Sequence, residues 1–528
     1  MDGAIALGRG NARRQVTAVS KRGRVLLLFS VFVVAACGLA YELVAGTLSS
    51  YLLGDATTQF SLTIGVFLCA MGAGSWLARF VKSDLLVRFI ELEVAVGVVG
   101  GASSIALFAV SAWAEPTFPA FFYLLLSVLG ALVGVEVPLI VRIVKHEGGF
   151  SEVLSDVLAL DYLGALAGSI LFPLFILPLL GLSRAAVVFG LLNLGVAALA
   201  LPLVEAKARR RLGLLVGVGA TSLAALLLVS PRLVGFLEDA LYEDHLIYAK
   251  SSRYQRIVVT RWHDDLRLYL DGHLQFSSID EARYHEALVV PAMESVPHPR
   301  SVLVLGGGDG LAVREILKYP TVEKVLLVDL DSDMTELGRT RRDFVRLNKG
   351  SLASPKVSIL NADAMQHLRE DDAFYDVILV DLPDPDSEVL AKLYSTAFYA
   401  LAEKRLALHG VLVTQATSPF YSREAFWSIV RTLQAAVPAE LPGTLHVVPY
   451  HESVPSFGEW GFALASHDTL DTKALAPHVP TRYLTPETLQ AMFVFGKDMT
   501  APAAVRINRL DDPVLFRYHR DGWRQFNE

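Results

Sequence analysis

The chain has 528 residues, 53% of them hydrophobic, and a formal net charge of −7, and its mean hydropathy is +0.44. These values exclude an ordinary soluble enzyme, because the chain is too apolar for one. The two cysteines, Cys37 and Cys69, lie in strongly apolar stretches, so they indicate neither a disulfide framework nor a metal site. We also expect no nucleic-acid partner.

Most of the apolar residues precede residue 231, where seven stretches each approach the ~20 residues that a helix needs to cross a bilayer. We therefore predict a membrane domain of about seven helices over 25–230, with the lipid bilayer as a partner, after a basic cytoplasmic segment over 1–24. The seven stretches cover roughly 25–45, 58–78, 89–112, 118–141, 158–181, 185–204 and 212–230.

Basic residues lie in alternate connections between these stretches, which by the positive-inside rule places the N-terminus in the cytoplasm. An odd number of crossings would then place everything after residue 230 outside. The basic residues are Arg13, Arg14, Lys21, Arg22, Arg24, Arg79, Lys82, Arg88, Arg142, Lys145, Lys207, Arg209, Arg210 and Arg211.

Carboxylates inside the predicted spans are costly, and two interpretations of them stay open. They form a cation path or a polyamine site in the membrane, or they are structural groups satisfied by neighbouring helices or lying near an interface. Gly164 and Gly168 form a small-residue pattern that predicts close helix packing. The acidic residues are Glu42, Glu91, Glu93, Glu136, Asp156 and Asp161.

After the membrane domain, residues 231–250 are polar and amphipathic and are expected to form a connector. Arg253–Thr260 and Asp265–Gln275 then alternate like strands, so 251–276 is predicted to be a small β unit. A helix follows over Asp280–Met293, and its first turns are rich in titratable groups.

The stretch Ser301–Asp331 has the pattern of a nucleotide-binding edge in a doubly wound sheet. Val302–Leu305 predicts a buried parallel strand, and the glycines that follow allow a turn too tight for side chains. Lys324–Val328 predicts the next strand, which delivers Asp329 about 20 residues beyond the turn, where a carboxylate can accept both ribose hydroxyls. The glycines are Gly306, Gly307, Gly308 and Gly310.

The turn lacks the Lys-Ser/Thr pair of a triphosphate site, which makes kinase or ATPase chemistry unlikely. It also carries Asp309, whose carboxylate would repel a pyrophosphate or a carboxylate but attract an ammonium group. The predicted ligand is a nucleoside with a cationic tail.

From about residue 242 to 500 the chain resembles the polyamine aminopropyltransferases, typified by spermidine synthase, in the variant with an N-terminal multi-pass membrane domain. The resemblance implies a helical membrane domain, a small β unit and a seven-stranded Rossmann-like domain of the methyltransferase type over 277–528. It also implies a homodimer or a larger homo-oligomer. The motifs are SSRYQRIVV, LYLDGHLQ, DEARYHE, VLVLGGGDGLAVREIL, VEKVLLVDLD, NADAMQHL, VILVDLPDPD, LYSTAFY and GVLVTQ.

By position, the resemblance implies roles for individual residues and names decarboxylated S-adenosylmethionine as co-substrate, with no prosthetic group. It makes Asp381 the proton acceptor, and it places Tyr284, Asp381 and Asp384 at the amine substrate. Asp329 replaces the Glu of most relatives, and Ala364 replaces a frequent Gly. The residues implied to hold the co-substrate are Gln255, His285, Gly306, Gly308, Asp309, Asp329, Asp363 and Ala364.

Two departures from the family pattern bear on the amine. Gln415-Ala416-Thr417 lacks the acid of the usual Gln-Gly-Glu, and VPSFGEWGF has Phe457 but no tyrosine. Both weaken recognition of a diamine's distal end, so putrescine is the default acceptor and another amine stays open. The alternatives are an S-adenosylmethionine-dependent methyltransferase and a non-catalytic, transporter-like membrane protein that senses polyamines.

The co-substrate also bears on localisation, because it is a cytosolic metabolite. We therefore expect a multi-pass protein of the cell membrane whose catalytic domain is cytoplasmic. This expectation conflicts with the seven predicted crossings, which would place the catalytic domain outside. A broken span or a re-entrant segment would make the number of crossings even and remove the conflict.

Overall fold

The computed structural model describes residues 21–53, 56–114, 117–145, 150–241, 244–436 and 445–527. The chain divides into two compact units, Met1–Leu241 and Tyr242–Glu528. The first 20 residues of the predicted basic segment 1–24, including Arg13 and Arg14, lie outside the described residues.

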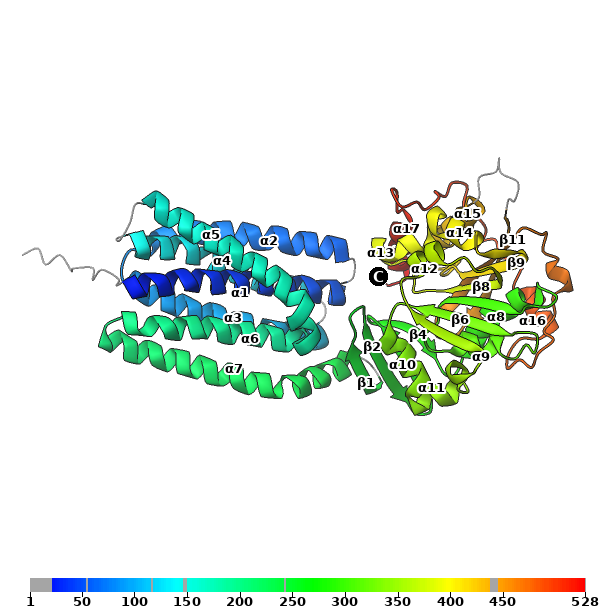
Figure 1. Cartoon of the computed structure of the whole chain (residues 1–528), viewed down its shortest axis with the longest axis horizontal. Coiled ribbons are helices and arrows are strands. Elements are labelled where there is room, and N and C mark those ends of the chain that lie inside the picture. Colours follow the sequence, from blue (N-terminus) through cyan, green and yellow to red (C-terminus); the bar gives the residue numbers. More distant parts are fainter. Residues whose placement is uncertain are drawn as a thin grey trace, which may run out of the picture. The chain divides into compact units, whose positions relative to one another are not determined.

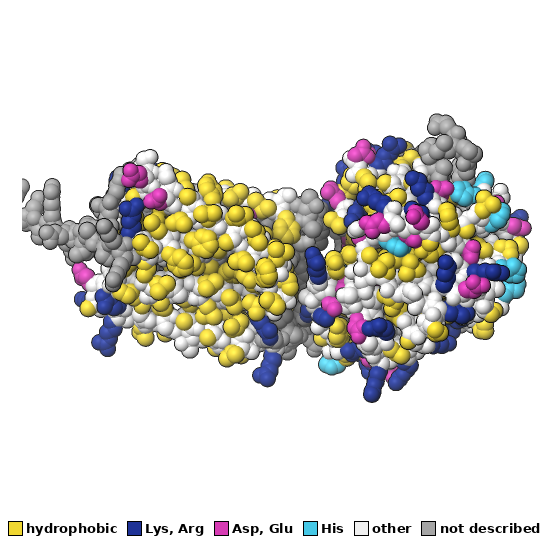
Figure 2. Space-filling model, in the orientation of Figure 1, with side chains coloured by type: hydrophobic (Ala, Val, Ile, Leu, Met, Phe, Trp, Pro, Cys, Tyr) yellow, Lys and Arg dark blue, Asp and Glu magenta, His cyan; other side chains and the backbone are white. Residues whose placement is uncertain are grey.

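The first unit is helical. Its central helix α1 lies against α2, α4, α5 and α6 (Figure 1). Among the described residues, six helical stretches are long and apolar enough to cross a membrane. Hydrophobic side chains cover the visible face between the charged ends (Figure 2). The helices are α1 Lys21–Leu53, α2 Ala56–Leu77, α3 Leu85–Trp113, α4 Phe118–Val144, α5 Phe150–Leu171, α6 Leu177–Ala200 and α7 Ala206–Leu241.

One of the six stretches, Ser151–Leu203, has 53 residues, which at ~1.5 Å per residue is far longer than a ~30 Å hydrocarbon layer. It contains α5, a π turn over Phe172–Ile176 and α6. Gly181 breaks it with φ 72° and ψ 172°, a conformation that is essentially restricted to glycine. Because α5 and α6 both lie against α1, the stretch comprises two helices, and the number of membrane crossings stays a prediction.

The predicted packing glycines lie where α5 meets α1. A Cβ at Gly164 would overlap the carbonyl oxygen of Phe32, and one at Gly168 would lie 2.8 Å from the carbonyl oxygen of Ala36. Only glycine allows the two backbones to approach so closely. The small-residue pattern therefore packs helices, as predicted.

The second unit begins with an antiparallel sheet in the order β1-β2-β3-β4. Its first strand lies in the segment predicted to be a connector, which is instead the end of α7 followed by β1. The short strand is stabilised by pairing with β2 and by Ile247, which packs against the hydrophobic cluster that contains Ile257 and Val259. The strands are β1 His245–Ser251, β2 Arg256–Trp262, β3 Asp265–Leu270 and β4 His273–Ser277.

The large sheet has seven strands in the order β10-β11-β9-β8-β5-β6-β7. The five strands from β9 to β7 are parallel, and β11 is antiparallel to both of its neighbours, β9 and β10. The chain order reverses between β5 and β8, where sheets of this kind bind ligands. The strands are β5 Ser301–Gly306, β6 Lys324–Asp329, β7 Val357–Asn361, β8 Tyr375–Asp381, β9 Leu406–Gln415, β10 His446–Val454 and β11 Gly458–Ser466.

Helices cover both faces of this sheet. Val302 and Val304 of β5 enter one hydrophobic core, and Leu303 and Leu305 enter the other, as the continuous apolar run predicts. The Rossmann-like fold class is confirmed. The helices are α8 Glu281–Glu294, α9 Leu311–Ile316, α10 Ser332–Thr340, α11 Arg342–Leu347, α12 Ala364–Glu370, α13 Glu388–Ala391, α14 Thr396–Glu403, α15 Arg423–Gln434, α16 Pro486–Ala491 and α17 Leu515–Asn527.

Candidate active site

The glycine turn after β5 touches the ends of its two neighbouring strands. Gly306 has φ 85°, and a Cβ there would overlap the carbonyl oxygen of Asp381 at the end of β8. A Cβ at Gly308 would lie 2.6 Å from Oδ2 of Asp329 at the end of β6. The absence of side chains therefore brings the turn backbone against both acids.

Asp329 accepts hydrogen bonds from the backbone N–H of Gly308 (3.0 Å) and of Asp331 (2.8 Å). Burial raises the pKa of Asp329 to about 6, although these two donors oppose the shift. Gln255 reaches this region indirectly, because its amide donates to Oδ2 of Asp331 (2.9 Å).

Asp309 and His285 influence each other electrostatically beside the turn. Burial raises the pKa of Asp309, while His285 opposes the shift. Burial alone would lower the pKa of His285, but its hydrogen bond to Glu281 and the charge of Asp309 raise it to about 9. His285 is therefore cationic at neutral pH and compensates the buried acid.

Glu281 holds this histidine in place and was not among the predicted site residues. Its Oε2 lies 3.1 Å from Nδ1 of His285 and 2.7 Å from Nη2 of Arg314, and its Oε1 lies 2.6 Å from Nη1 of Arg482. Burial would raise the pKa of Glu281, but the hydrogen bonds from His285 and Arg314 outweigh it and hold the pKa at about 2. Its position at the start of DEARYHE was the only signal in the sequence.

Asp381 ends β8 and accepts a hydrogen bond from the hydroxyl of Tyr284 (2.7 Å). Burial raises the pKa of Asp381 to about 6, with a contribution from Asp309, while His285 and Tyr284 oppose it. The ring of Tyr284 is held by Phe462 and Phe457, with centroids 5.4 and 6.1 Å away. The carboxylate thus lies beside a largely aromatic wall.

Asp384 lies in the loop after β8 and is held from three sides. Its Oδ1 accepts from Nε2 of Gln415 (3.2 Å), and its Oδ2 lies 3.1 Å from Nε2 of His519 and 3.5 Å from Oγ1 of Thr417. His519 comes from α17, near the end of the chain, and is 8% exposed. No motif in the sequence pointed to it.

Asp363 and Ala364 lie after β7, at the carboxyl edge of the same sheet. Oδ1 of Asp363 caps α12 by accepting from the backbone N–H of Gln366 (2.9 Å), and Oδ2 lies 3.3 Å from Nζ of Lys392. Burial opposes but does not outweigh these contacts, which lower the pKa of Asp363. Ala364 is buried in the first turn of α12. In this structure Asp363 is engaged with α12 and Lys392.

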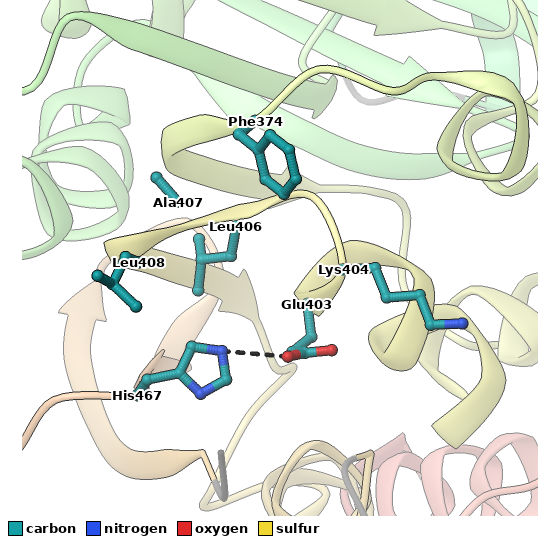
Figure 3. A pocket seen from close by; sticks show the side chains of 7 residues that line it. All are labelled: Phe374, Glu403, Lys404, Leu406, Ala407, Leu408 and His467. Atoms are coloured by element: carbon teal, nitrogen blue, oxygen red, sulfur yellow. Dashed lines mark ion pairs between the residues drawn. The ribbon is translucent and has the colours of Figure 1, made fainter. Parts of the chain in front are cut away.

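A separate hollow lies at the opposite edge of the sheet, where β8 and β9 begin (Figure 3). His467 and Glu403 form an ion pair across it (3.1 Å). None of the predicted site residues lines it, so it is not the candidate site. Its lining residues are Phe374, Glu403, Lys404, Leu406, Ala407, Leu408 and His467.

Comparisons with known proteins show the family to which this chain belongs. The family model of the spermine/spermidine synthase domain matches residues 281–473. Polyamine aminopropyltransferase 2 of Ralstonia nicotianae is 48% identical over 511 residues, which are 95% of this chain and 99% of that protein. The chain belongs to the polyamine aminopropyltransferase family. Because the alignment covers 95% of this aminopropyltransferase, most of the helical unit belongs to the shared part.

Two further proteins resemble this aminopropyltransferase. The polyamine aminopropyltransferase of Leptospira interrogans is 45% identical over 508 residues, which are 94% of this chain and 99% of that protein. A crystal structure of spermidine synthase in complex with the transition-state analogue AdoDATO is 26% identical, with a TM-score of 0.43, and the match covers 48% of this chain and 88% of that one.

The predicted enzyme class is confirmed by these relatives. This aminopropyltransferase is a transferase of polyamine biosynthesis, and the co-substrate of its family is decarboxylated S-adenosylmethionine. The methyltransferase and the non-catalytic sensor, which the sequence left open, are therefore set aside.

Proposed function

We propose that this aminopropyltransferase is a membrane-integrated spermidine synthase that uses putrescine as its acceptor. The observation that carries the proposal is the pairing of Asp381 with Tyr284 at the switch point of the sheet, beside Asp309 in the glycine turn. A carboxylate that can take a proton thus lies close to one that attracts the cationic tail of a nucleoside.

The co-substrate occupies the carboxyl edge of β5, β6 and β7 in this proposal. The turn at Gly306 and Gly308 admits the nucleoside, and Asp329 accepts its ribose hydroxyls. Asp309 binds the primary ammonium of the aminopropyl group. The remaining proposed contacts are Gln255 and His285 on one side and Asp363 and Ala364 near the adenine on the other.

The reaction requires an unprotonated amine, because an alkylammonium ion has no free electron pair. Asp381 takes a proton from the acceptor nitrogen, whose electron pair attacks the propyl carbon bonded to the sulfonium. A C–N bond forms as the C–S bond breaks in line, and the sulfur keeps the bonding electrons in neutral methylthioadenosine. The neighbouring acids stabilise the two cationic reactants in the buried site.

Asp384 and Tyr284 position the acceptor amine in this proposal. The acid that usually follows Gln415 is replaced by Thr417, and Phe457 packs on Tyr284 in the loop that lacks a tyrosine. Asp384 is then the acid nearest the far end of a diamine. Its hydrogen bonds to Gln415 and His519 orient it for that contact.

The helical unit spans the cell membrane in this proposal, with the N-terminus and the catalytic unit in the cytoplasm. Six apolar stretches of sufficient length support the membrane assignment, and the supply of co-substrate supports the cytoplasmic side. By the family resemblance the chain forms a homodimer or a larger homo-oligomer, which light scattering of the purified protein measures.

The test is incubation of the purified full-length protein with decarboxylated S-adenosylmethionine and a panel of amines. We expect methylthioadenosine and spermidine to form in equal amounts with putrescine. Faster turnover with another amine would replace putrescine as the acceptor, and no methylthioadenosine with any amine would refute the proposal.

A further inference from the structure

Four of the six acidic residues in the predicted spans fall into two groups. Glu91 forms ion pairs with Nη1 of Arg88 (2.7 Å) and Nη2 of Arg211 (2.5 Å). Asp156 forms an ion pair with Nη2 of Arg24 (3.2 Å). These two acids have cationic partners near the helix starts. Their contacts fit the structural interpretation of a carboxylate inside a predicted span.

Glu93 and Glu136 differ, because neither forms an ion pair among the described residues. Glu93 is 0% exposed and Glu136 is 2% exposed. Oε2 of Glu93 accepts from Nδ2 of Asn193 (3.0 Å), whose Oδ1 accepts from the hydroxyl of Tyr41 (3.3 Å). Within the described part of the chain, Oε1 of each glutamate is buried without a hydrogen-bond partner.

Close packing of four helices produces this arrangement. A Cβ at Gly97 of α3 would lie 2.8 Å from the carbonyl oxygen of Gly190 of α6, so the two helices meet closely beside Glu93 and Asn193. A Cβ at Gly100 would lie 2.5 Å from the ring of Tyr41 of α1. Glu136 of α4 interacts electrostatically with Glu93 and with Asp161 of α5.

An ionised carboxylate buried in an apolar interior without a cation is unfavourable, so each glutamate either keeps a proton or takes up a cation. An alkylammonium group would supply both the missing charge and three N–H donors for the unpartnered oxygens. A metal ion fits less well, because no group of three potential metal ligands is found among the described residues. Both the acceptor and the product of aminopropyl transfer carry alkylammonium groups.

We propose that Glu93 and Glu136 form a binding site for an alkylammonium group inside the helical unit, completed by Asn193 and Tyr41. The identity of the ligand as the acceptor amine or its product rests on the proposed function. The site gives the helical unit a role in binding the polyamines that the catalytic unit uses or makes.

The experiment measures binding of radiolabelled putrescine and spermidine to the full-length protein in lipid nanodiscs by equilibrium dialysis. Wild type is expected to bind amine in both units. Asp384→Asn weakens only the catalytic site, whereas Glu93→Gln and Glu136→Gln each abolish only the site in the helical unit. Glu91→Gln is the matched control, because it removes the same charge two residues from Glu93, and it keeps both sites and full transfer activity.

Several results would overturn the proposal. One is a wild-type protein that binds amine only at the site weakened by Asp384→Asn, and another is unchanged binding in Glu93→Gln and Glu136→Gln. Labelled sodium or potassium that binds through Glu136 while amines do not would also overturn it. The two proposals fail separately: methylthioadenosine formation without a second site refutes this site alone, and a second site without methylthioadenosine refutes the proposed function alone.

Discussion

Asp381 shows how opposing effects set the protonation of one residue. Burial and the nearby charge of Asp309 favour the neutral acid, while the cation of His285 and the hydroxyl of Tyr284 favour the carboxylate. Burial wins in part, which raises the pKa to about 6. At neutral pH the group is therefore mostly ionised, yet basic enough to accept a proton from an amine.

Replacing Asp381 with asparagine tests its role as the base. We expect Asp381→Asn to lower turnover by roughly 10² or more, since a positioned base typically contributes 10²–10⁴-fold. Binding of methylthioadenosine, followed by calorimetry, should stay close to that of wild type. Turnover like that of wild type in this variant would assign the proton transfer to another group.

The dependence of kcat/KM for the amine on pH tests the environment of Asp381. Because the base must be ionised, we expect the rate to fall as the pH drops through about 6, or somewhat lower once the cationic co-substrate is bound. Tyr284→Phe removes a donor that stabilises the carboxylate, so the acidic limb should move to higher pH. An unmoved limb would show that Tyr284 does not act on Asp381.

At the scale of elements, α8 is anchored through Glu281, which joins it to Arg314 of α9 and to Arg482 before α16. The pKa of Glu281, about 2, lies below the usual value of 4.5. The ionised form therefore stabilises the fold above about pH 4.5, and this contribution is lost as the pH falls through about 2. The same carboxylate orients His285 towards the site.

Glu281→Gln removes one of the two buried carboxylates that balance the guanidinium of Arg314 and leaves only Glu315. We expect a loss of about 3–5 kcal/mol in the free energy of unfolding of the catalytic unit, measured by denaturant titration at neutral pH. Glu336→Gln is the control, because the Glu336–Arg339 pair is exposed and should contribute less than about 1 kcal/mol. Equal effects of the two variants would contradict the anchoring role.

The C-terminal helix α17 contributes His519 to the amine end of the site. His519→Ala removes the nearest partner of Oδ2 of Asp384, so the carboxylate can turn away from the amine. We expect the KM for putrescine to rise roughly tenfold with little change in kcat, the size of one lost hydrogen bond to a charged group. Arg524→Ala on the same helix, at an exposed position, should leave both constants unchanged. A fall in kcat alone would contradict a role in amine binding.

At the scale of the whole molecule, two arguments about sidedness disagree. Helix pairs bridged by arginine, α1–α5 through Arg24 and α3–α7 through Arg211, place the starts of these four helices at one end of the helical unit. Helix α7 then leads away from that basic end. Seven full crossings would put the catalytic unit opposite the N-terminus, whereas the supply of co-substrate favours the cytoplasm.

Protease protection in sealed vesicles decides between the two. We expect the catalytic unit to survive protease added to right-side-out vesicles and to be cut in inverted ones, followed with an antibody against the C-terminal helix. Cleavage in the right-side-out vesicles would place the enzyme outside and would require an external supply of its co-substrate.

Features that depend on local pattern could be predicted from the amino-acid sequence alone. Apolar runs of the right length predicted the helical unit. The strand, glycine turn and acid of Ser301–Asp331 predicted the nucleotide-binding edge of the sheet. Both predictions succeed locally, because the spacing of hydrophobic residues and the backbone freedom of glycine depend on residues that are neighbours in the sequence. The motifs also predicted the enzyme class that the relatives confirm.

The contacts between distant side chains could not be predicted in this way and became visible in the fold. His519 contacts Asp384 across 135 positions, and Glu281 contacts Arg482 across 201. Most of β1 lies in the segment that the sequence predicted to be a connector, and these residues form a strand because they pair with β2. The same holds in the helical unit, where Glu91 and Glu93 differ because arginines reach Glu91 but not Glu93 among the described residues. Burial and partners depend on packing between elements, which no local pattern specifies.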